Sequence, residues 1–142
     1  MRAVTILMAL LTGGCAPQPP LMPVASVEQL MEGTVHPAAE VLFKSVGTII
    51  SEKGVEEIAP RNDEEWANVR NNAVTLAESG NLLMIGKRAK DQGDWMKMAQ
   101  GLIEAGVAAT KATEAKDVQA LFDAGGKVYE ACERCHGRYR KK

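Results

Sequence analysis

The chain has 142 residues, of which 46% are hydrophobic and 25% are charged, and its formal net charge is -1. This composition is typical of one soluble globular domain. The balanced charge provides no strongly basic surface, which argues against nucleic acid as a partner.

The N-terminal stretch from Met1 to Gly14 has one positive charge, a short apolar run and then small residues. This pattern is typical of a secretory signal peptide, and the run is too short for a permanent membrane-spanning helix. Residues Leu11 to Cys15 look like a bacterial lipobox, in which cleavage leaves Cys15 as a lipid-modified membrane anchor. Ordinary cleavage after Ala16 is the alternative, and it would remove Cys15. Both alternatives export the chain, so we expect a periplasmic protein, anchored as a lipoprotein in the first case.

Residues 15–25 are rich in proline and are predicted to form a tether. A folded domain is expected over residues 26–142. Ser26 is the predicted N-cap of the first helix, with Gln29 in the position of a capping box.

The first helix is predicted to run from Val27 to Ile50, because apolar residues recur along it at a spacing of three to four. Pro37 lies inside this helix and is expected to kink it. Residues 54–61 are predicted to form a loop.

Three further amphipathic helices are predicted, and no strand-like alternation is evident. Four helices with short links indicate an all-α fold, an antiparallel four-helix bundle. Gly125 and Gly126 in the last helix are interpreted either as a point of close helix approach or as tolerated helix glycines. The expected boundaries are a cap at Asn62 or Asp63 and an end before Gly86 for the second helix, a cap at Asp94 for the third, and a turn over Glu114 to Asp117 before the fourth.

Near the end of the fourth helix the chain reads Cys132-Glu133-Arg134-Cys135-His136. C-x-x-C-H is the attachment signature of a c-type haem. Positions i, i+3 and i+4 share one face of an α-helix, so two thiols can each add to one haem vinyl group while His136 binds the iron. A buried porphyrin would also supply volume to a core with only two residues each of Phe, Trp and Tyr. The sequence therefore predicts one covalent haem c.

Other classes of site share part of this motif. C-x-x-C alone is also found in redox disulfides and in half-sites for zinc. The adjacent His136 favours haem, and the chain has no second C-x-x-C to complete a zinc site. A haem-free helical module, with Cys132 and Cys135 as a disulfide or metal pair, stays as an alternative.

The motif lies close to the C-terminus and extends to C-x-x-C-H-x-x-Y-R, with Tyr139 and Arg140 in its last two positions. This arrangement resembles the cytochrome c-prime family, in which an antiparallel four-helix bundle carries one haem on its last helix. The resemblance implies that the two cysteines are the thioether donors and that His136 is the proximal iron ligand. Glu133 departs from the Lys that many members have after the first Cys. Members are often homodimers through their first two helices, which implies the same association here.

In this family a first-helix residue faces the open side of the haem: an apolar residue in high-spin members, and an iron-binding Met in low-spin members. Met31 lies at about the corresponding depth, so the resemblance makes it the candidate distal iron ligand. Core packing is the alternative role of Met31, with the neighbouring Leu30 as a steric cover of the haem. His36 lies about 140° around a regular helix from Met31 and is expected at the surface, not at the iron.

Taken together, these residues predict a monohaem c-type cytochrome that carries single electrons in the periplasm to a redox partner protein, and not an enzyme. Ligation by both His136 and Met31 would favour this function, because a six-coordinate iron changes little in geometry between its oxidation states. The alternative is a five-coordinate haem protein that binds nitric oxide or carbon monoxide. The same fold supports both functions, so the fold does not decide between them.

Overall fold

The computed structural model describes residues 19–140, and it shows a predominantly helical chain with one small two-stranded sheet. The prediction of a helical fold is confirmed, whereas the sheet was not predicted. The expected signal peptide and Cys15 lie outside the described residues. Within residues 19–140, no helix combines the length and the apolar character needed to cross a lipid bilayer.

The first helical segment consists of α1 (Val27–Leu30), the π-helical turn η1 (Met31–Val35) and α2 (His36–Ser45). Ser26 caps α1 as predicted. Its hydroxyl accepts the N–H of Gln29 at 3.1 Å, and the Gln29 side chain accepts the N–H of Ser26 at 2.9 Å. This reciprocal capping box satisfies two backbone donors at the start of the helix.

A π turn replaces regular helix just before Pro37. The N–H of His36 donates to the carbonyl of Met31, so this bond spans five residues, where a regular α-helix spans four. In a regular helix the ring of Pro37 would clash with the carbonyl four residues earlier, and a wider turn relieves that clash. The expected disturbance at Pro37 therefore takes the form of one extra residue in the preceding turn. Consistent with this, the buried residues Leu30 and Val35 are five residues apart.

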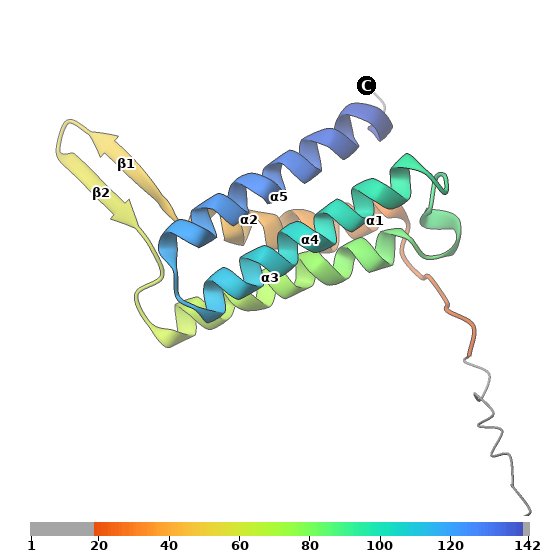
Figure 1. The fold of residues 1–142 in the computed structure, drawn as a ribbon, viewed down its shortest axis with the longest axis horizontal. Helices are drawn as coiled ribbons and strands as arrows, with labels where there is room; N and C mark the ends of the chain where they lie inside the picture. The colour runs from red at the N-terminus through yellow and green to blue at the C-terminus, as the bar shows by residue number, and fades with distance from the viewer. Residues whose placement is uncertain (1–18, 141–142) are drawn as a thin grey trace, which may run out of the picture.

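A β-hairpin follows α2, where helix and loop were predicted. Strands β1 (Gly47–Ser51) and β2 (Gly54–Ile58) pair antiparallel and project away from the helices (Figure 1). The predicted helix end at Ile50 is wrong, because α2 ends at Ser45. β-branched residues dominate this stretch and favour a pleated strand over a helix. Gly54, with φ of +125°, starts β2 in a conformation that residues with a side chain rarely adopt.

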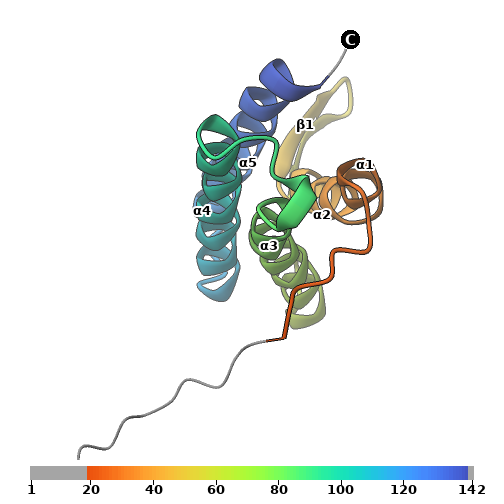
Figure 2. The same ribbon diagram turned by 90° about the vertical axis from the view of Figure 1, so that its right-hand side faces the viewer.

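Three long helices complete the fold: α3 (Asp63–Leu83), α4 (Asp94–Glu114) and α5 (Val118–Tyr139). They run in alternating directions along the molecule (Figure 1), and the first helical segment packs beside α3 (Figure 2). Asn62 caps α3 by accepting a backbone N–H at 2.9 Å, and Asp117 caps α5 in the same way. Of the two caps predicted for α3, the structure selects Asn62.

The start of α4 differs from the prediction. Asp94 is the first helical residue, and the N-cap residue Gly93 has no side chain to offer. The carboxylate of Asp91 instead accepts the N–H groups of Gly93 at 2.8 Å and of Trp95 at 3.1 Å. A carboxylate at this place also suits the positive end of the helix dipole. The predicted cap Asp94 is therefore wrong, and Asp91 satisfies the backbone donors.

Small residues bring α3 and α4 close together. A Cβ added at Gly106 would lie 2.6 Å from the backbone nitrogen of Ala77, and one at Gly80 would lie 2.7 Å from the carbonyl oxygen of Ala99. Neither position leaves room for a side chain, so these two glycines set the distance between the helices.

The glycines of α5 behave differently. A Cβ added at Gly125 or Gly126 would meet no heavy atom within 4 Å, so the expectation of a close helix approach there is wrong. The helix packs on α4 through a buried apolar stripe and contacts α2 only sparsely. The stripe comprises Leu121, Ala124, Val128 and Ala131. This leaves space between the first helical segment and the second half of α5.

Candidate functional site

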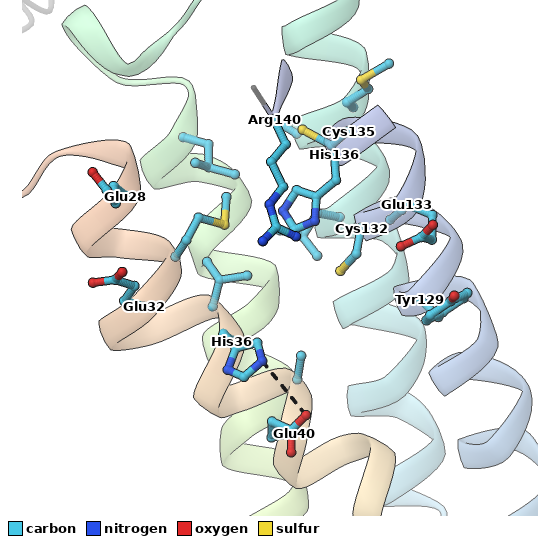
Figure 3. Close-up of a pocket in the computed structure, with 18 of the residues that line it drawn as sticks. Glu28, Glu32, His36, Glu40, Tyr129, Cys132, Glu133, Cys135, His136 and Arg140 are labelled. Atoms are coloured by element: carbon cyan, nitrogen blue, oxygen red, sulfur yellow. Dashed lines mark ion pairs between the residues drawn. The ribbon is translucent and has the colours of Figure 1, made fainter. Parts of the chain in front are cut away.

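A cavity of about 890 Å³ occupies the space between the first helical segment and α5 (Figure 3). Its size lies in the range of pockets that bind cofactors and other small molecules. The inner wall is apolar and comes from the end of α3 and the first half of α4. The residues of this wall are Leu83, Trp95, Ala99 and Leu102, all of them buried.

α5 brings the whole C-x-x-C-H motif to this cavity. Cys132, Cys135 and His136 all line it, as expected for positions i, i+3 and i+4 on one helix face. Figure 3 shows the His136 ring projecting from α5 toward the first helical segment, with both cysteines beside it. The two thiols are free and half-buried. The structure thus brings the three predicted attachment residues together in one cavity of ligand size.

The thiols lie in an environment that keeps them protonated. Burial raises the pKa of Cys132, and the negative charges of neighbouring Cys135 and Glu133 raise it further. Burial also raises the pKa of Cys135. Cysteines that act in redox disulfides have a lowered pKa, because the thiolate is their reactive form. The direction of the pKa shift of both thiols thus differs from that of such reactive cysteines.

The first helical segment supplies the opposite wall. Met31, the first residue of the π turn, is half-buried and lines the cavity. Leu30 is buried in the core and is not part of the cavity wall. Of the two residues considered for this side, Met31 is therefore the one that reaches the cavity. Its thioether sulfur is a known type of haem iron ligand.

His36 also lines the cavity, which the sequence analysis did not expect. The π turn explains the difference, because a bond across five residues brings Met31 and His36 to the same side of the segment. The prediction that His36 is a surface residue is confirmed, since 75% of its side chain is exposed. Its Nε2 lies 3.9 Å from a carboxylate oxygen of Glu40 (Figure 3). His36 therefore belongs to the rim of the cavity.

Aromatic residues shape the cavity at two places. Phe43 of α2 and Tyr129 of α5 meet edge to face, with ring centroids 6.4 Å apart, and both line the cavity. Trp95 is buried at the inner wall, where its indole N–H donates to the carbonyl of Leu83 at 2.9 Å. Trp95 was not predicted as a site residue, because an apolar residue on an amphipathic helix carries no signal that it lines a cavity.

The last turn of α5 is tied to the start of α4. Tyr139 donates a hydrogen bond to Asp91, and its ring meets Trp95 edge to face with centroids 5.0 Å apart. Arg138 forms an ion pair with Asp94 at 2.9 Å. The hydrogen bond from Tyr139 is the main cause of a lowered pKa for Asp91, and the backbone N–H of Trp95 adds to it. Sequence reasoning missed Asp91, because nothing local signals a partner 48 residues away.

Charged side chains line the rim. Arg140 ends α5 and lies beside His136 (Figure 3). The carboxylates of Glu28, Glu32 and Glu133 belong to the same rim. An apolar interior with charged side chains at its rim suits a largely apolar ligand that has some polar substituents.

Within residues 19–140, no group of three or more His, Cys, Asp and Glu side chains is arranged to hold a metal ion. The sequence matches no protein-family model, no curated protein and no solved structure. The function is therefore inferred from the residues that line the cavity.

Proposed function

We propose that this protein is a monohaem c-type cytochrome that carries single electrons in the periplasm, with haem bound covalently through Cys132 and Cys135. One observation carries the proposal: the C-x-x-C-H residues and Met31 line the same cavity from opposite walls. Met31 and the motif are about a hundred residues apart in the chain, and they line one cavity.

We further propose that the first helical segment and α3, α4 and α5 form an antiparallel four-helix bundle of the cytochrome c-prime type. The alternating directions of the three long helices support this arrangement, as do their short connections. In such a bundle, cofactor sites are built from side chains on facing helices. The hairpin β1–β2 would be an addition between the first two helices of the bundle.

The residues present fit a haem. The cavity has ligand size, its inner wall is apolar, and two free thiols stand next to an imidazole on one helix face. When bound, a haem supplies a one-electron redox centre. Cys132 and Cys135 would hold it through thioether bonds, His136 would bind the iron from α5, and Met31 would bind from the opposite wall.

The side chains around the cavity have properties that suit electron transfer. Trp95 and Leu102 are buried and keep water from the inner wall. If both His136 and Met31 bound the iron, the six-coordinate centre would change little in geometry between its oxidation states. The rim is open to solvent, which leaves one side free for a redox partner protein.

The protein produced in an exporting host with haem-maturation machinery should contain covalent haem. After denaturation and acid–organic extraction, we expect the colour to stay with the polypeptide, because thioether bonds survive both treatments. The Cys132→Ser/Cys135→Ser variant is the control and should release any bound haem into the organic phase. Release of haem from the unaltered protein would refute the cytochrome proposal.

Met31 decides between an electron carrier and a binder of nitric oxide or carbon monoxide. If Met31 binds the iron, the unaltered ferric protein is low-spin, and Met31→Leu should make it five-coordinate and high-spin with faster binding of carbon monoxide to the ferrous form. The change keeps approximate volume and should cost less than about 1.5 kcal/mol of stability. Electron paramagnetic resonance and stopped-flow measurements test this.

Met98→Leu is the matched control for this variant, because Met98 is also half-buried and lines the same cavity from α4. We expect it to leave the spin state unchanged. An unaltered ferric protein that is already high-spin would make Met31 a packing residue and favour gas binding. A spin change in Met98→Leu alone would identify Met98 as the ligand.

A further inference from the structure

We infer that Tyr139 and Asp91 are positioning residues for His136, because their hydrogen bond fixes the last turn of α5 against the start of α4. The inference rests on the proposed haem function, in which His136 is the proximal ligand. Asp91 lies in the connection between α3 and α4. It would thus help to position an iron ligand that lies on another element, α5.

The last part of α5 needs an anchor of this kind. The buried residues of α5 end at Ala131, so the described residues that follow have no fully buried side chain. Helix ends fray unless tertiary contacts hold them. His136 therefore lies on a part of the helix that the apolar core alone does not fix.

Two side chains in this part of α5 form polar contacts with residues at the start of α4 and just before it. Tyr139 donates to Oδ2 of Asp91, and Arg138 pairs with Asp94 at 2.9 Å. Asp91 is itself held in place, because its Oδ1 accepts the N–H groups of Gly93 at 2.8 Å and of Trp95 at 3.1 Å. Hydrogen bonds to a charged acceptor are stronger than those between neutral groups. The carboxylate of Asp91 is thus held in place before Tyr139 binds it, and the bond from Tyr139 connects the end of α5 to the start of α4.

The spacing of the residues makes this contact effective at the site. Tyr139 lies three residues after His136, and positions i and i+3 share one helix face. A contact that fixes Tyr139 therefore also fixes the position of His136 along the axis of α5 and its rotation about that axis, both relative to α4. Trp95 completes the arrangement, because its ring packs against Tyr139 and also lines the cavity.

Tyr139→Phe tests the inference in the haem-loaded, full-length protein. The variant keeps the ring on Trp95 and removes only the hydroxyl donor. We expect backbone amides of residues 136–140 to exchange hydrogen at least about fivefold faster, which corresponds to the loss of one hydrogen bond. Asp91→Asn should give a smaller increase, because the amide still caps α4 but accepts from Tyr139 without a charge.

A second measurement separates positioning of the ligand from general stability. Tyr139→Phe is titrated with urea while haem absorption monitors the bond between His136 and the iron and circular dichroism monitors helix content. The bond should be lost at a lower urea concentration than the helices. In the unaltered protein the two transitions should coincide. Asp63→Asn is the control, because it weakens a similar exposed contact, Lys116 to Asp63 at 2.6 Å, at the far end of the helices.

Unchanged amide exchange at residues 136–140 in Tyr139→Phe, with coincident transitions, would overturn the inference. A Tyr139→Phe protein that keeps its helix content but fails to retain His136 ligation would support it. Failure of the haem proposal would be seen separately, as release of haem from the unaltered protein on extraction. Amide exchange would still report in that case whether the contact holds the end of α5.

Discussion

In the proposed haem protein, His136→Ala should abolish the spectral features that depend on the bond between His136 and the iron, and it should reduce the yield of mature protein. The imidazole is the donor that α5 places in the cavity beside the two thiols. Loss of an outer-shell partner of a metal ligand typically costs about 10–100-fold in affinity, so we expect removal of the ligand itself to cost at least as much. Absorption spectra of the purified protein in both oxidation states measure the effect.

Rescue and a second histidine make this experiment specific. Added imidazole should partly restore the spectrum of His136→Ala, because the substitution leaves space for it at the α5 wall. His36→Ala is the matched control, since His36 lies on the rim of the same cavity with most of its side chain exposed, and it should leave the spectrum unchanged. If His136→Ala kept the normal spectrum and His36→Ala lost it, His36 and not His136 would be the iron ligand.

Gly106→Ala should destabilise the protein by about 2 kcal/mol, because it adds a methyl group where α3 and α4 are in close contact. The new Cβ would lie 2.6 Å from the backbone nitrogen and 2.9 Å from the Cα of Ala77, so no rotamer change can make room. Overpacking of this kind costs ~1–3 kcal/mol, and separation of two long helices belongs at the upper end. The gain in helix propensity returns about 1 kcal/mol. Urea unfolding followed by circular dichroism measures the difference.

Gly125→Ala is the matched control for this prediction and should have the opposite sign. A Cβ there would meet no heavy atom within 4 Å, and the residue lies within α5. The substitution should therefore stabilise the protein by about 0.5–1 kcal/mol through helix propensity alone. Equal effects of the two substitutions would contradict the close contact between α3 and α4.

Local sequence signals predicted much of the helical structure. The capping box at Ser26, the cap at Asn62 and the apolar spacing of α3, α4 and α5 depend on neighbouring residues, and the structure contains all of them. The hairpin was missed because the spacing of the first helix seemed to continue to Ile49. The β-branched residues around Ile49, followed by Gly54, were the signal for a strand and a tight connection.

The remaining differences depend on contacts between distant segments. Gly106 and Gly125 are both helix glycines in the sequence, and only the tertiary structure shows that a neighbouring helix leaves no space for a side chain at Gly106, whereas space remains at Gly125. Asp91, and not Asp94, accepts the backbone N–H groups at the start of α4, and it also accepts a hydrogen bond from Tyr139, 48 residues away. His36 is exposed as predicted, but it lines the same cavity as Met31, because a π turn and not a regular α-helix precedes Pro37.

The arrangement of the candidate site was partly predictable, because helix geometry alone fixes which helix face the motif residues share. The three motif residues had to share a helix face, and they line one cavity. Met31 came from a family resemblance, and it lines the same cavity from the other side. The inner wall, with Trp95, could not be assigned from sequence, because an apolar stripe has the same pattern whether it faces a core or a cavity.

The π turn also bears on how this cavity can change during evolution. One residue inserted into a regular helix rotates everything beyond it by about 100°, which would turn either Leu30 or Leu42 out of the core. Here a wide turn between Leu30 and His36 takes up one extra residue, and both leucines remain buried. A one-residue deletion that restores regular helix in this turn should therefore alter the cavity wall that carries Met31 while Leu30 and Leu42 stay in the core.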